Sequence, residues 1–207
     1  MNKQTISIIF VAIVGSLALF YKLKFKKMKL AYLARKEFEK WENKNELDPE
    51  MSDTLVKYWQ SAGMIWITKN NISEYDNEWA WSAAVISYLA QQVEPEFPKS
   101  TAHADYTVEA RERRKEGQLN YIAFNPDEVK PKIGDIFVKK RAGGYMGDLD
   151  GLYSTAKSHG DIVTDSKGDR LILTGGNLSN TMKETELKLN QNGYIKNQSD
   201  IIAIIKM

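Results

Sequence analysis

The chain changes character near its middle, and this change most constrains its fold. Up to about residue 117, apolar residues recur at steps of three and four, which is typical of amphipathic helices. Beyond that point the apolar segments are short, rich in β-branched residues and separated by Gly, Asp and Ser, as strands are. Helices first and strands afterwards predict an α+β fold, with an antiparallel sheet packed on a central helix.

The pattern is clear enough to place the main elements. The most apolar helical segment starts near Trp79, where Asp76 or Asn77 can cap it, and ends before Pro95, so we expect it to be the central helix. Another helix is expected over residues 101–117. Strands are expected in "IGDIFVKK", "GDIVTD", "RLILTGG" and "DIIAIIKM", with the turn "DSKGDR" at residues 165–170. The long Gly-rich segment at residues 141–158 is expected to be a loop that borders a site.

An uncharged apolar run extends from Ile6 to Phe20. It is close to the shortest length that spans a bilayer, and no small-residue cleavage site follows it, so we expect an uncleaved transmembrane helix. A signal-peptide core stays an alternative. The expected organisation is a membrane anchor with a basic flank at residues 1–28 and one domain at residues 29–207. Within that domain, residues 29–78 form a helical cover and residues 79–207 form the core.

Composition excludes several classes of function. The chain has no Cys, so disulfides, thiolate zinc sites and cysteine nucleophiles are excluded. The formal charge is +2 over 207 residues, which gives no reason to expect binding to nucleic acid. Asp148 and Asp150 do not match a calcium loop, and we expect neither a metal nor a cofactor. Five lysines lie between Lys22 and Lys29, and by charge bias alone they favour the cytoplasmic side for the domain.

A few polar residues stand at the ends of these elements. Ser82 starts the central helix in "WSAAVISY", His159 starts the strand "HGDIVT", and Asn177 follows "TGG". A helix packed on a sheet brings its N-terminus to the rim of that sheet, so the three side chains can converge as nucleophile, base and orienting amide. Each also has an ordinary structural explanation, as a small helix-start residue, a buried histidine or a turn asparagine. Spacing alone does not decide between the two.

The order of these segments resembles the NlpC-type and CHAP families of papain-like peptidoglycan amidases and endopeptidases. The motifs are "WSAAVISY", "PKIGDIFV" at residues 131–138, "HGDIVT" and "GGN" at residues 175–177. With "FPKSTAHADY", they also resemble an uncharacterised bacterial family that is usually grouped with those hydrolases. The resemblance implies a papain-like domain in which Ser82 replaces the nucleophilic cysteine, His159 is the general base and Asn177 orients it.

Other residues in these motifs are candidates for substrate binding. His103 and Tyr106 are three residues apart, so they share one face of a helix and can bind polar groups of a substrate or stabilise the fold. Asp161 is a second possible partner for His159, because it lies two residues along the same strand. Trp81 is expected to fill the core or the wall of a cleft, with stacking on a sugar as a further possibility.

These residues predict a membrane-anchored hydrolase that cleaves an amide or ester in the cell envelope, with peptidoglycan or a peptide as substrate. The resemblance places the domain on the envelope side of the membrane. One alternative is a catalytically inactive module of the same fold that recognises a peptide, a glycan or a protein partner. Another, which follows from the lysines, is an adaptor on the cytoplasmic leaflet.

Overall fold

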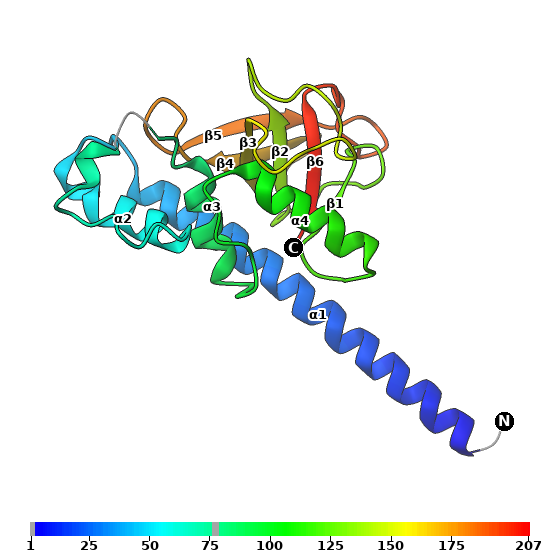
Figure 1. Ribbon diagram of the computed structural model, residues 1–207. Helices are drawn as coiled ribbons and strands as arrows, with labels where there is room; N and C mark the ends of the chain where they lie inside the picture. Colours follow the sequence, from blue (N-terminus) through cyan, green and yellow to red (C-terminus); the bar gives the residue numbers. More distant parts are fainter. Residues whose placement is uncertain (1–2, 76–78) are drawn as a thin grey trace.

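A computed structural model shows an α+β fold built on one six-stranded antiparallel sheet (Figure 1), which confirms the predicted fold class in this respect. The structure describes residues 3–75 and 79–207, and side chains from residue 21 onwards. The strand order is β1-β6-β2-β3-β4-β5. The strands are β1 (Ile122–Phe124), β2 (Ile136–Lys140), β3 (Ser158–Lys167), β4 (Arg170–Gly175), β5 (Lys183–Lys188) and β6 (Ile201–Lys206).

The helices lie together on one side of this sheet (Figure 1). They are α1 (Lys3–Lys40), α2 (Ser52–Ser61), α3 (Ser82–Gln91) and α4 (His103–Lys115), with short 3-10 turns at Pro49–Met51 and Ile72–Glu74. The predicted central helix is α3, and it contacts α1, α2 and β3. It begins at Ser82 rather than near Trp79, and the two proposed capping residues, Asp76 and Asn77, lie outside the described residues.

Both faces of the sheet are covered, and the strands alternate accordingly. On one face, Ile136, Val138 and Ile162 join the large core formed with the helices. On the other face, Phe137 and Val163 join a smaller cluster, whose further members are Leu171, Leu173, Ile195, Ile201 and Ile204. Because both faces are buried, successive residues of a strand are all apolar, and the strands read as continuous apolar runs in the sequence.

The predicted fold class is wrong in one part, the transmembrane helix. Among the described residues, no helix is long and apolar enough to cross a membrane. The side chains of the apolar run Ile6–Phe20 lie outside the described part. From Tyr21 onwards α1 is too rich in lysine for a bilayer interior, and it continues without a break through residue 28 into the domain. The second half of α1 is therefore a structural part of the domain.

The lysines of α1 show how this half of the helix is held. Lys26 Nζ lies 2.5 Å from Glu94, and Lys27 Nζ lies 2.8 Å from Asp135. Lys29 Nζ donates to the Gln92 carbonyl at 3.0 Å. Three of the five lysines between Lys22 and Lys29 thus bind the rest of the domain. Because these lysines stabilise the fold, their charge gives no independent indication of which side of a membrane the domain lies on.

The segment "PKIGD" before β2 contacts α1. Gly134 has a φ of +85°, and a Cβ at this position would collide with the backbone of Lys27. Next to it, the buried Asp135 carboxylate accepts bonds from Lys27 and from Lys206 of β6. The glycine and aspartate of this motif therefore fasten the first helix and the last strand to the centre of the sheet.

Candidate functional site

Ser82 is the first residue of α3 and is buried. The preceding residue, Trp81, anchors this end of the helix, because its indole stacks on Trp41 with ring centres 4.6 Å apart and its Nε1 donates to Glu46 at 2.6 Å. The first backbone N–H groups of an α-helix have no partner within the helix and carry partial positive charge. Ser82 is therefore held beside a group of donors that favours a developing oxyanion.

The hydroxyl of Ser82 meets His103, not His159. Ser82 Oγ lies 2.7 Å from His103 Nε2, and His103 Nδ1 lies 2.5 Å from the Tyr106 hydroxyl. All three side chains are buried. Burial lowers the pKa of His103 well below its ordinary value of 6.5, with the neighbouring His159 acting in the same direction, so the imidazole is neutral.

A neutral imidazole has one donor nitrogen and one acceptor nitrogen. If Nε2 is the acceptor, the Ser82 hydroxyl donates to it and His103 Nδ1–H donates to the Tyr106 oxygen. This tautomer is the one in which His103 can remove the proton of Ser82. The result is a hydroxyl, a base and an orienting phenol in one hydrogen-bonded chain.

His159 belongs to a second polar group beside the first. Its Nε2 lies 2.9 Å from Asp161 Oδ1, while Lys139 Nζ donates to Asp161 Oδ2 at 2.7 Å. Burial acts to raise the pKa of Asp161, but His159 and Lys139 outweigh it and lower the pKa to about 2. The imidazole rings of His103 and His159 have centres 5.3 Å apart. Asp161, expected only as the second choice, is thus the observed partner of His159.

Asn177 follows β4 in a left-handed conformation, with a φ of +56°, and its side chain is half-buried. Within the described residues its amide has no hydrogen bond to His159 or to any other side chain. The structure therefore brings Ser82, His103, Tyr106, His159 and Asp161 together, but it does not join Ser82, His159 and Asn177 in one chain. The catalytic roles predicted for these residues stay predictions.

Glycines that the sequence reasoning passed over make this cluster possible. A Cβ on Gly160, between His159 and Asp161, would lie 2.5 Å from His103 Nδ1 and 2.6 Å from the Tyr106 hydroxyl. A Cβ on Gly175 would overlap Asp161, and one on Gly176 would overlap Trp81. The signal was available, since a glycine inside a strand often marks a close approach.

A small pocket opens onto Ser82 and His103. Its volume is about 160 Å³, and its wall is formed by the starts of α3 and α4 and by both ends of the long loop before β3. The lining residues are Ala80, Ser82, Thr101, Ala102, His103, Arg141, Thr155, Ala156, Lys157 and Ser158. The expected position of the Gly-rich loop beside a site agrees with this lining. Trp81 does not line this pocket and is 2 % exposed, so its ring belongs to the core.

Metal binding has no support in the described residues, where no group of three or more His, Asp or Glu side chains is placed to hold an ion. The chemistry available here is that of a hydroxyl, two imidazoles, a phenol and a row of helix N–H groups. It suits proton transfer and nucleophilic attack by an alcohol.

Comparison with known proteins identifies a family. Residues 41–205 match the model of a family described as "Uncharacterized protein conserved in bacteria (DUF2272)". No curated protein and no solved structure matches the chain. The matched range includes α2, α3, α4 and the sheet up to residue 205, and with them the polar cluster around Ser82. The chain belongs to this family of bacterial proteins.

Proposed function

We propose that this protein is a hydrolase that uses Ser82 as its nucleophile and His103 as its general base. The observation that carries the proposal is the 2.7 Å contact between Ser82 Oγ and His103 Nε2 at the wall of a pocket large enough for part of a substrate. A serine hydroxyl reacts only when a base is placed to remove its proton, and this geometry provides one. The base differs from the one that the resemblance to NlpC-type enzymes implies, which is His159.

The proposed reaction has two steps. Ser82 Oγ attacks the carbonyl carbon while its proton passes to His103 Nε2, and the first N–H groups of α3 stabilise the negative charge on the carbonyl oxygen. His103 then gives the proton to the leaving amine or alcohol, and an acyl-serine remains. Water attacks this ester with His103 again as the base, which releases the acid and restores Ser82.

Tyr106 and the second polar group have supporting roles in this proposal. Tyr106 bonds His103 Nδ1 and so orients the ring towards Ser82, and its own pKa is raised well above the ordinary value by burial and by the charge of Asp161, so it stays a neutral phenol. Lys139 and Asp161 hold His159 beside His103. From there His159 can bind the substrate or the leaving group.

The substrate class is the finer part of the proposal. The order of the motifs and the antiparallel sheet packed on α3 support a place among the papain-like hydrolases, in which a helix start presents the nucleophile. On that basis the proposed substrate is an amide or ester of the cell envelope, such as a peptidoglycan peptide.

Labelling with a fluorophosphonate probe tests the nucleophile directly. The wild-type protein should become covalently labelled, and Ser82→Ala and His103→Gln should lose the label. Ser158→Ala is the matched control, because Ser158 lines the same pocket but has its hydroxyl directed at the Ala156 carbonyl rather than at an imidazole. Labelling that disappears in Ser158→Ala and persists in Ser82→Ala would contradict the assignment.

A binding module without catalysis is the second candidate, and one observation favours it. The residue behind His103 is a neutral phenol instead of a carboxylate, and burial lowers the pKa of His103, so the imidazole is a weaker base than in a Ser-His-Asp triad. If the wild-type protein neither reacts with the probe nor hydrolyses peptide or ester substrates, yet binds ligands in this pocket equally well with Ser82→Ala, this second function is the correct one.

A further inference from the structure

The pocket beside Ser82 is electrostatically one-sided. Its described lining includes two cationic side chains, Arg141 and Lys157, and no Asp or Glu. The starts of α3 and α4 also contribute to its wall, through Ser82 and through Ala102 and His103. Each helix start adds unpaired N–H groups and partial positive charge. Four sources of positive potential thus meet in about 160 Å³.

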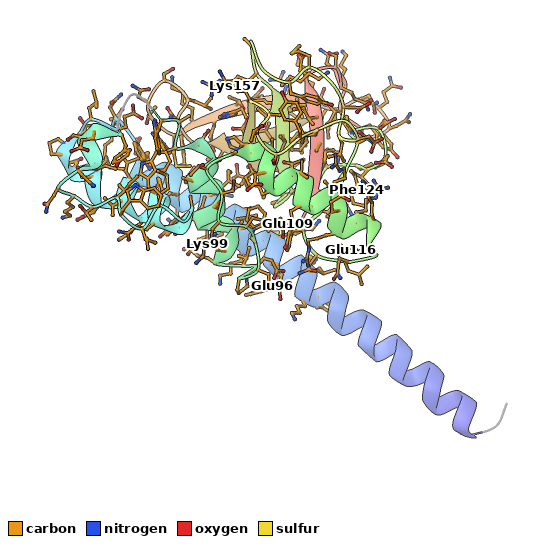
Figure 2. All side chains as sticks on the ribbon, in the orientation of Figure 1. Glu96, Lys99, Glu109, Glu116, Phe124 and Lys157 are labelled. Carbon is orange, nitrogen blue, oxygen red and sulfur yellow. The ribbon has the colours of Figure 1, made fainter. Side chains whose placement is uncertain are left out.

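Neither cation is neutralised by the protein in the part of the chain that the structure describes, where no ion pair joins Arg141 or Lys157 to a carboxylate. Both side chains are exposed. In Figure 2, Lys157 lies at the upper edge of the molecule, far from the labelled carboxylates Glu96, Glu109 and Glu116. The nearby carboxylate of Asp161 is already bound by Lys139 and His159. Within residues 3–75 and 79–207, the field in the pocket is therefore not cancelled by a nearby free carboxylate.

We propose that this pocket binds a carboxylate and that Arg141 is its principal partner, with Lys157 and the N–H groups at the start of α4 as additional donors. A guanidinium offers paired N–H donors that match the two oxygens of a carboxylate. The consequence for the substrate rests on the proposed function: the bond that Ser82 attacks lies next to a free carboxylate. The substrate is therefore an acyl compound that carries a carboxylate near this bond, rather than a neutral one.

Hydroxyl groups complete the recognition. Thr101 and Thr155 line the same pocket and can each donate one hydrogen bond. A pocket lined by these hydroxyls, by the two cations and by Ser82 suits a ligand with a carboxylate at one end and a carbonyl at the other. Such a ligand has its carbonyl carbon near Ser82 when its carboxylate is near Arg141.

Binding can be measured without catalysis in the full chain carrying Ser82→Ala. The probes are N-acetylglycine, which carries a carboxylate, and N-acetylglycinamide, which has the same shape without the charge. The backbone amide signals of Ala102 and His103 are followed by NMR during titration. We expect N-acetylglycine to shift them saturably and N-acetylglycinamide to leave them unchanged. Adding Arg141→Gln should raise the dissociation constant about tenfold, as loss of a charge-assisted hydrogen bond does.

The matched control is Lys140→Gln, which removes the same charge from the next residue, whose side chain lines a different pocket. It should leave the affinity unchanged. Equal shifts by both probes, or an affinity insensitive to Arg141→Gln, would overturn the proposal. Shifts with inorganic phosphate but not with N-acetylglycine would also overturn it in favour of a phosphate site. If N-acetylglycine binds but the wild-type protein never reacts with the fluorophosphonate, the carboxylate site stands and the proposed hydrolase fails.

Discussion

Two buried carboxylates, Asp135 and Asp161, have similar surroundings and different consequences. Both are fully buried, and each is bound by two basic side chains. The partners of Asp135 are Lys27 from α1 and Lys206 from β6, at the two ends of the domain. The partners of Asp161 are His159 on its own strand and Lys139 on the neighbouring β2.

The difference lies in what each carboxylate connects. Asp135 joins segments that are far apart in the sequence, so it stabilises the attachment of α1 to the sheet. Asp161 joins residues that the β2–β3 pairing already places together, since Lys139 is opposite His159 in the register. It therefore adds little to the connectivity of the fold and mainly positions an imidazole beside the pocket. A buried charge can serve the fold or the site, and the location of its partners tells which.

The largest effect is expected for Asp135→Asn. Removing this charge leaves Lys27 and Lys206 without their shared partner in a largely buried position, which should lower the free energy of unfolding by about 3 to 5 kcal/mol. Urea denaturation measures the loss. Asp169→Asn, at an exposed turn, is the control and should change stability by less than about 0.5 kcal/mol. A small effect of Asp135→Asn would remove the distinction between the two carboxylates.

The pH dependence of stability should reveal Asp161. Its pKa is about 2 in the folded chain, against an ordinary value of 3.8, so folding favours the ionised form. This contribution is complete above about pH 4 and is lost as the pH falls towards 2; the shift is worth about 2 kcal/mol. Urea midpoints measured between pH 6 and pH 2 should fall less steeply in Asp161→Asn than in the wild type. Parallel profiles would show that Asp161 is not held in this way.

Tyr106→Phe should separate orientation from packing. The ring stays in the core, while His103 loses the hydrogen bond at Nδ1 that orients its imidazole. We expect the rate of fluorophosphonate labelling to fall about tenfold, which corresponds to about 1.4 kcal/mol. Tyr121→Phe, which removes another phenol that is hydrogen-bonded to Glu109 away from the site, should label at the wild-type rate. Equal labelling of both variants would assign Tyr106 a purely structural role.

The smallest effect is expected for the ion pair between Lys26 and Glu94. Lys26→Gln should lower the free energy of unfolding by about 1 kcal/mol, because the Glu94 side chain is largely buried but keeps its bond from Asn120. Lys36→Gln removes a pair whose two side chains are more than half exposed, and it should destabilise the fold less than Lys26→Gln does. Thermal denaturation of the two variants compares them. A reversed order would contradict the anchoring role of the α1 lysines.

Much of the fold could be predicted because apolar periodicity reports burial. The apolar spacing of the segment that became α3 and the short apolar runs that became β2, β3, β4 and β6 were visible in the sequence. The edge strand β5, with the sequence "KETELK", was missed because Leu187 is its one apolar residue, and its pairing with β4 makes it a strand. The three-residue β1 was too short to be seen, and it forms through its pairing with β6.

The candidate site, like the fold, could be predicted only in part. Ser82 and His159 stood out as polar residues at the starts of elements, His103 and Tyr106 through their spacing in one motif, and Asp161 through its place two residues after His159. Their pairing was not readable. Whether Ser82 meets His103 or His159 depends on the angle at which α3 and α4 approach β3, and on the space that Gly160 leaves between them. Such angles arise from packing between segments that are distant in the sequence.

The sequence by itself determined the α+β class, the exclusion of thiol chemistry and the set of polar residues from which a site can be built. Only the tertiary structure decided that His103 is the partner of Ser82, that Asp161 rather than Asn177 binds His159, and that the lysines of α1 belong to the domain. The physical reason is that periodicity and composition report how each segment meets solvent. Hydrogen bonds between segments depend on a few ångströms of relative position, which the packing of the whole core sets.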